Sequence, residues 1–87
     1  MDDNKYKIAS HVAWRRVEDE IVVLDLETSI YYSLNEVASR IWELIHQGKG
    51  ASEISQALTK EYEVDGKRVQ KDASSFVAEL KKEKLIA

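Results

Sequence analysis

The stretch "ETSIYYSLNEVASRIWELI" (Glu27–Ile45) contains the change of hydrophobic period that decides the fold. Its aromatic run "IYYS" has no charge or proline, which predicts a short β-strand. Ser33 and Asn35 are both suited to cap a following helix, and Ser33 with Glu36 matches the capping-box pattern. The apolar residues after the run recur at the spacing of an amphipathic helix: Leu34, Val37, Ala38, Ile41, Trp42 and Ile45.

Two further strands are predicted before this stretch. The segments "IASHVAWRRV" (8–17) and "EIVVLDLE" (20–27) flank an acidic turn and predict a hairpin. With "IYYS" they form a three-stranded antiparallel meander. Residues 1–7 are expected to be a flexible tail, and residues 8–87 a single domain. Along the second strand, three apolar residues alternate with a second set, the two-residue period of a half-buried sheet: Val22, Leu24 and Leu26 against Val23, Asp25 and Glu27.

Three helices are predicted after the sheet. The first ends near Gly48, a candidate for the left-handed position beyond a helix. Ser52 is expected to cap the second helix and Asp65 the third. We therefore expect an α+β, winged-helix-like domain in which the helices pack on one face of the sheet. The expected inward residues are Ile54, Ala57, Leu58 and Tyr62 in the second helix, and Val69, Ala73, Phe76 and Leu80 in the third.

Composition narrows the class of protein. The chain has 87 residues, no cysteine and a formal net charge of −3. Disulfides and thiolate metal sites are therefore excluded, and the acidity argues against general nucleic-acid binding. No apolar run approaches the length of a membrane span, and the first residues lack the features of a signal peptide. We expect a cytoplasmic protein that binds neither membrane nor nucleic acid.

No motif for catalysis, cofactor binding or metal binding stands out. His11 and His46 lie far apart in the sequence and fit no ligand spacing, so we expect them at the surface or a helix end. Phosphate-binding glycine loops and nucleophile-elbow motifs do not occur. We expect no enzyme activity, no cofactor and no metal. Trp42 is expected in the core, whereas the sequence leaves open whether Trp14 faces core or solvent.

The third predicted strand, taken as Ser29–Ser33, is an edge strand by topology. An edge strand has unpaired backbone groups, and a peptide can add to it as a further strand. If the last helix lies beside the strand, the two form a groove. Tyr31 and Tyr32 point to opposite faces, so one tyrosine lines the groove and the other covers the sheet. Alternatively, both tyrosines simply fill a small core.

The segment "IVVLDLETSIYYSLNEVASRIWELI" fits the pattern T-x-x-YY-x-LN-x-x-A-x-x-IW-x-L. With "VDGKRVQKDASSFVAELKKEKLI", it resembles the PqqD-like family of small proteins that recognise the leader peptides of ribosomally made, modified peptides. The resemblance covers about Val22–Ile86. The "YY-x-LN" and "IW" residues are most similar to the stand-alone leader-binding proteins of lasso peptide biosynthesis. The chain departs from the family at Ser29, often glycine, and at "HQGKG", where members often have "DG".

The resemblance implies a non-catalytic protein that binds its leader as an antiparallel strand on the third strand and against the third helix. It also implies a leader-cleaving cysteine protease and an ATP-dependent macrocyclase as partners. Lys67, Arg68 and Lys71 would favour an acidic leader. The implied peptide-binding residues are Ser29, Ile30, Tyr31, Tyr32 and Ser33 in the strand, and Arg68, Val69, Asp72, Ala73 and Phe76 in the helix.

Two other functions remain open. A winged-helix DNA-binding transcriptional regulator has the same fold class, but it needs a basic recognition helix. The predicted second helix, "SEISQALTKEY" (52–62), has two acids and one base. A small-molecule binder or a hydrolase without a recognisable motif is the third alternative.

Overall fold

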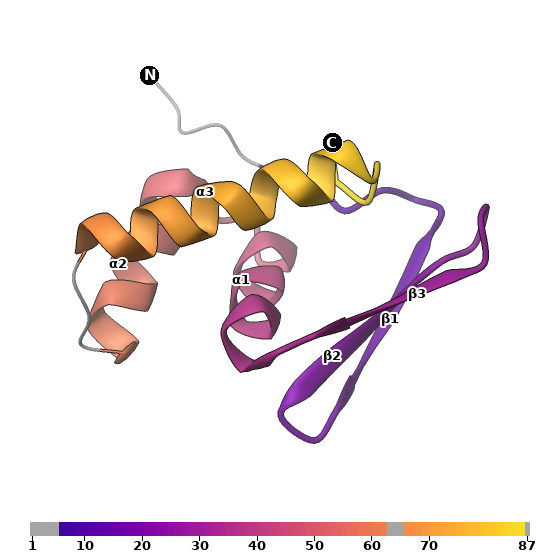
Figure 1. Cartoon of the computed structure of the whole chain (residues 1–87), viewed down its shortest axis with the longest axis horizontal. Coiled ribbons are helices and arrows are strands. Elements are labelled where there is room, and N and C mark those ends of the chain that lie inside the picture. Colours follow the sequence, from indigo (N-terminus) through magenta and orange to yellow (C-terminus); the bar gives the residue numbers. More distant parts are fainter. Residues whose placement is uncertain (1–5, 63–65, 87) are drawn as a thin grey trace.

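Three strands precede three helices in the computed structural model, which describes residues 6–62 and 66–86 (Figure 1). Strand β3 passes into helix α1 through one residue, Asn35. The predicted order of elements is therefore confirmed. The bounds are β1 Val12–Val17, β2 Glu20–Asp25, β3 Ile30–Leu34, α1 Glu36–His46, α2 Ala51–Tyr62 and α3 Gly66–Lys82.

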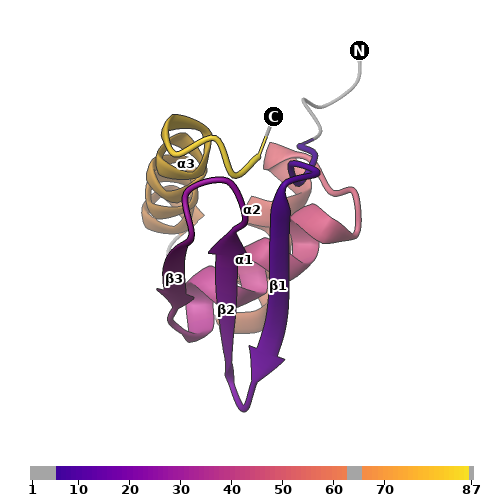
Figure 2. The ribbon, with the colours of Figure 1, turned by 90° about the vertical axis from the view of Figure 1, so that its right-hand side faces the viewer.

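The sheet is an antiparallel meander in the order β1-β2-β3. A two-residue turn joins β1 to β2, and its first residue, Glu18, has a positive φ of 58°. Figure 2 shows the sheet in front and the helices behind it, so one face of the sheet is covered. The expected α+β fold is thus confirmed, including the helices on a single face.

The buried face of β2 includes an aspartate. Ile21, Val23 and Asp25 are buried, while Leu26 lies beyond the strand and is exposed. The alternation was predicted, but composition does not identify the buried parity, because Val22 and Leu24 are as hydrophobic as the apolar residues that are buried. Register decides between the two faces, since a shift of one residue moves every side chain to the other face.

The ends of the helices agree with the prediction in part. Asn35 caps α1, because its side chain accepts a hydrogen bond from the Ala38 amide, and Gly48 has a φ of 87° just beyond the helix. The prediction for Ser52 is wrong: α2 begins at Ala51, and the Glu53 carboxylate accepts a hydrogen bond from the Gly50 amide at 3.0 Å. Asp65, the expected cap of α3, lies outside the described residues.

Trp42 is at the centre of the core, as predicted. It is fully buried, and the ring of Trp14 packs edge-on against it with a centroid separation of 6.2 Å. Trp14 therefore faces the core. His46, at the end of α1, also packs edge-on against the Trp14 ring, with centroids 5.0 Å apart.

The C-terminal segment closes the core. Of the predicted α3 stripe, Ala73 and Leu80 are buried, and Val77 is a buried residue that the prediction missed. Leu85 and Ile86 are also buried after the helix ends. They lie beside the N-terminal segment: Ile8 pairs with Ile86, and the Ala9 amide donates to the Leu85 carbonyl at 2.9 Å.

Tyr6 packs against the core although the prediction places it in the tail. The Lys81 ammonium lies 5.1 Å from the centre of its ring. Across the described residues, no helix combines the length and the apolar character needed to cross a membrane.

Asp25 organises the turn that leads into β3. Its Oδ1 accepts hydrogen bonds from the amides of Glu27 at 2.9 Å and Thr28 at 3.2 Å, and its carbonyl accepts one from the Ser29 amide at 2.7 Å. Burial raises the pKa of the Asp25 carboxyl, but the two amides and nearby His11 outweigh this effect, so the pKa lies below its usual value. Asp25 is only 3% exposed, and it positions the first residue of the strand.

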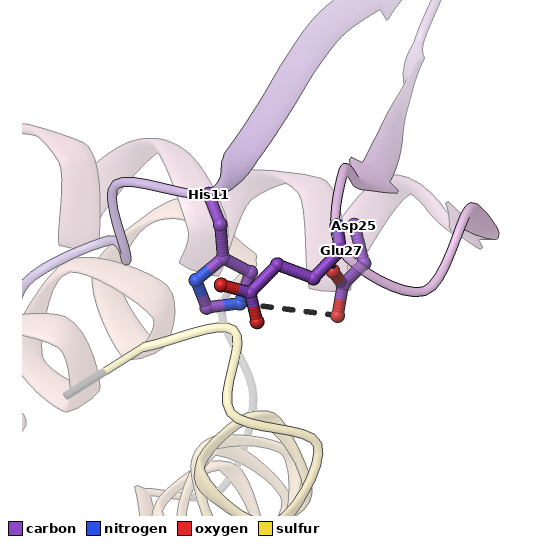
Figure 3. A group of neighbouring side chains, drawn as sticks. All are labelled: His11, Asp25 and Glu27. Carbon is purple, nitrogen blue, oxygen red and sulfur yellow. Dashed lines mark hydrogen bonds and ion pairs between the residues drawn. The ribbon is translucent and has the colours of Figure 1, made fainter.

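His11, Asp25 and Glu27 form a cluster at this turn (Figure 3). Their potential ligand atoms lie within 4.8 Å of one another. Asp25 has one oxygen engaged by two amides, and its Oδ2 lies 3.9 Å from His11 Nε2. The Leu26 amide also donates to the His11 carbonyl at 2.8 Å. Through these contacts the cluster supports the turn. His11 is half-buried and does not lie on the open surface.

Ser39 holds the other end of β3. Its Oγ accepts a hydrogen bond from the Ile21 amide at 2.8 Å and donates one to the Leu34 carbonyl at 3.0 Å. Ile21 and Leu34 are paired residues of β2 and β3, so the hydroxyl bridges the last pair of the ladder. Because Ser39 belongs to α1 and is 1% exposed, it joins the sheet to the helix inside the core.

We expect Ser39→Ala to lower the free energy of unfolding by about 1–3 kcal/mol, because it leaves a buried amide and a buried carbonyl without their partner. Urea denaturation followed by circular dichroism measures the change. Ser74→Ala, an exposed serine on α3, is the matched control. Equal stability of the two variants would contradict the bridging role.

Asp25→Asn tests the charge of the buried carboxylate. Because the folded pKa of Asp25 is lowered, its charge stabilises the fold at neutral pH, and this contribution is lost as the pH falls below about 4. The difference in unfolding free energy between wild type and Asp25→Asn should therefore shrink on acidification. Asp19→Asn, at the exposed hairpin turn, is the control. A difference that does not change with pH would show that the Asp25 charge contributes nothing.

Candidate functional site

The outer edge of β3 is open. β3 pairs with β2 along one edge, and no described residue forms a further strand along its other edge. Ile30 is 49% exposed and Tyr31 is 69% exposed, so the strand presents two large side chains to solvent. The strand has no charge and no proline to discourage pairing. This edge therefore has the features of a site for strand addition.

The two tyrosines have different environments. Tyr32 is opposite Val23, which is buried, so Tyr32 points toward the helices together with Ile30 and Leu34. Tyr31 is opposite Leu24 and points to the uncovered face of the sheet. The alternation was predicted, and the pairing register shows that Tyr32 is the tyrosine on the helical side.

A groove of about 670 Å³ lies between β3 and the C-terminal half of α3. The Tyr32 hydroxyl spans it, donating a hydrogen bond to Glu83 Oε1 at 3.2 Å. Burial raises the pKa of this hydroxyl, and the bond to Glu83 raises it further. We call this hollow the β3–α3 groove. It is lined by Ile30, Tyr32, Ser33, Leu34, Ser75, Phe76, Glu79, Leu80, Glu83 and Leu85.

A second hollow of about 490 Å³ lies beside the N-terminal half of α3, and we call it the helical pocket. Val37, 43% exposed although it belongs to the predicted core stripe of α1, is part of its wall. Leu34 and Phe76 line the groove, while Val37 and Ala73, each three residues away, line the pocket. The two hollows therefore follow each other along α3. The lining of the pocket is Val37, Ile41, Leu58, Tyr62, Arg68, Val69, Asp72 and Ala73.

The structure divides the predicted peptide-binding residues among four places. Ser29 belongs to the turn before β3, and Tyr31 lies on the uncovered face. The other eight line the two hollows, four in each: Ile30, Tyr32, Ser33 and Phe76 in the β3–α3 groove, and Arg68, Val69, Asp72 and Ala73 in the helical pocket.

Sequence reasoning missed the two acids of the groove. Glu79 and Glu83 are three and seven residues after Phe76 and lie on the same side of the chain. This spacing is a helical one, and it was available as a signal. Leu34 and Leu80 were predicted as core residues, and they are both core and groove floor.

Lys67 is not placed to meet a peptide on β3. It lines a hollow between α2 and α3 together with Lys60 and Gln70. Of the three cations expected to attract an acidic leader, Arg68 is the one that lines the helical pocket, where it is accompanied by Asp72. None of the three cations lines the β3–α3 groove, and the expected preference for an acidic leader stays a prediction.

Ser29 occupies one of the two positions where the chain departs from the family pattern. Its φ is 62°, in the left-handed region where glycine is favoured. The Ser29 amide donates to the Asp25 carbonyl, so the turn keeps its hydrogen bond with serine in place.

Comparison with known proteins places the chain in a family. Residues 20–86 match the family model for coenzyme PQQ synthesis protein D (PqqD). The structure of TbiB1 in complex with the TbiA(β) leader peptide has 39% sequence identity and a TM-score of 0.88, covering 92% of this chain and 93% of that one.

A second structure, lasso peptide synthetase B1 complexed with the leader peptide, shares the fold. Its TM-score is 0.88 at 24% identity, and the similarity covers 95% of this chain and 98% of that chain. No curated protein matches the sequence. The match over residues 20–86 and the identity to TbiB1 show that this chain belongs to the PqqD family.

Proposed function

We propose that this protein is a leader-peptide-binding protein, which captures a ribosomal precursor peptide by strand addition to β3 and presents it to processing enzymes. The observation that carries the proposal is the open edge of β3 beside an apolar groove. The relative TbiB1, 39% identical, forms a complex with a leader peptide. Because the two chains share the fold over nearly their whole length, this similarity supports leader binding here as well.

The bound leader runs antiparallel to β3 in this proposal. Backbone hydrogen bonds to the open edge supply affinity, and alternate side chains enter the β3–α3 groove. Ile30, Tyr32 and Phe76 are among the residues that line it. The N-terminal part of the leader continues past Leu34 toward the helical pocket, where Arg68, Val69, Asp72 and Ala73 meet it.

The role of binding is presentation. Holding the leader keeps the core peptide close to enzymes that act on it, which raises its effective concentration. We assign the protein itself no catalytic step. The sequence resemblance to leader-binding proteins of lasso peptide biosynthesis makes a cysteine protease and an ATP-dependent macrocyclase the proposed partners, acting in the cytoplasm.

A DNA-binding regulator is less consistent with the surface of α2. This helix would have to be the recognition helix, and it needs cations for phosphate contacts. Glu61 instead accepts two hydrogen bonds from the Arg40 guanidinium, at 2.9 and 2.8 Å. The net charge of −3 also argues against binding to the phosphates of DNA. Titration with random duplex DNA at low salt is the direct test of this alternative.

The binding test uses leader peptides from short reading frames beside the gene. Each peptide is labelled and titrated with the protein by fluorescence anisotropy. We expect one leader to bind saturably and random DNA not to bind. Saturable binding of DNA and of none of the leaders would instead support the regulator.

Tyr32→Ala should weaken leader binding by at least about tenfold, or about 1.4 kcal/mol, because it removes an aromatic side chain that lines the groove. Tyr31→Ala is the matched control: it deletes the same side chain one residue away, from the uncovered face. Circular dichroism establishes that both variants are folded. If Tyr32→Ala binds the leader as tightly as the wild type does, Tyr32 has no role in the groove.

A further inference from the structure

The charges that line the β3–α3 groove are all of one sign. Glu79 and Glu83 are part of its wall, and among the described residues that line it there is no lysine or arginine. Both acids are exposed. A peptide strand on β3 therefore lies between an open sheet edge and two carboxylates.

None of the lysines of α3, nor Lys84 just beyond its end, lines this groove. Lys81 stacks over the ring of Tyr6. Lys82 and Lys84 flank Glu83 in the sequence, but neither lines the groove or the helical pocket. Lys71 also lines neither hollow, and Lys67 contributes to the hollow between α2 and α3. The groove thus presents negative charge toward β3, although α3 as a whole is rich in lysine.

The acids are concentrated at one end of the site. The bond from Tyr32 to Glu83 places the end of α3 beside the middle of β3, while the helical pocket lies beyond Leu34 at the other end of the strand. A leader that is antiparallel to β3 enters at the Leu34 end and leaves at the Ile30 end. Its C-terminal half therefore passes the two carboxylates.

The floor suits a long basic side chain. Ile30, Phe76 and Leu80 line the same groove as the acids, and their apolar groups can cover the methylene stem of a lysine or arginine. A carboxylate accepts more than one hydrogen bond, so Glu83 can accept from Tyr32 and from a bound cation at the same time. A glutamate of the peptide at the same place would be repelled by both acids.

We propose that Glu79 and Glu83 determine specificity for a leader with a lysine or arginine in the C-terminal half of the β3-paired segment, on the side that faces α3. This inference rests on the proposed function and adds the chemistry of the ligand. It is the opposite of the preference for an acidic leader that the lysines of the sequence suggest.

The test is a charge scan of the labelled leader that saturates the wild-type protein. Each leader residue is replaced in turn by lysine and by glutamate, and every peptide is titrated against three proteins. These are the wild type, Glu79→Lys/Glu83→Lys, and Glu18→Lys/Asp19→Lys. The third protein has the same change in net charge, placed at the exposed turn between β1 and β2.

For the wild type, we expect glutamate to bind about tenfold more weakly than lysine at one or two alternate positions of a single short segment. The preference should reverse in Glu79→Lys/Glu83→Lys and persist in Glu18→Lys/Asp19→Lys. High salt should reduce it in every case.

Two results would overturn this specificity while leaving the proposed function intact. One is saturable binding with no position that prefers lysine, and the other is a preference that survives reversal of both groove acids. Failure of every leader to bind the folded wild-type protein would instead overturn the proposed function itself, and the specificity with it.

Discussion

The hydrogen bonds of two buried side chains, Asp25 and Ser39, hold the strand on which the site is built. β3 has a partner on one side only, so half of its backbone groups have no ladder to join. Asp25 accepts hydrogen bonds from three amides of the preceding turn through its carboxylate and its carbonyl. Ser39 completes the last pair of the ladder from within α1. Each end of an otherwise exposed strand is thereby tied to the core.

This arrangement reconciles two opposing requirements of an edge strand. To accept a peptide, the strand must keep its outer backbone groups free, which also makes it prone to fraying and to unwanted pairing. Polar contacts at the ends maintain its position without covering the edge. Tyr32 adds a contact of the same kind across the groove, through its bond to Glu83. The strand is thus ordered before a ligand arrives, which lowers the entropy cost of binding.

The small size of the domain gives ligand binding a further consequence. A chain of 87 residues buries a limited core, so its stability is modest. A ligand that binds only the folded state adds to that stability by mass action. A peptide on β3 would also place its backbone against the exposed edge and its side chains over Ile30, which is half exposed. Recognition and stabilisation of the fold are coupled through the same strand.

Local sequence determined the elements of this protein, and the tertiary structure decided their faces and their charges. The switch from a two-residue to a helical period at Leu34 indicated strand and helix, and the "YY-x-LN" pattern indicated the family. The buried parity of β2 was not readable, because Val22 and Val23 are equally apolar and Asp25 is buried for its hydrogen bonds. Ser39 gave no signal either, since its two partners come from other strands. The groove acids and the division of the predicted site into two hollows depend on which side of α3 meets β3. The helical spacing of Phe76, Glu79 and Glu83 shows that they share one side of the chain, but not which element that side faces. That choice is made by packing between residues far apart in the chain.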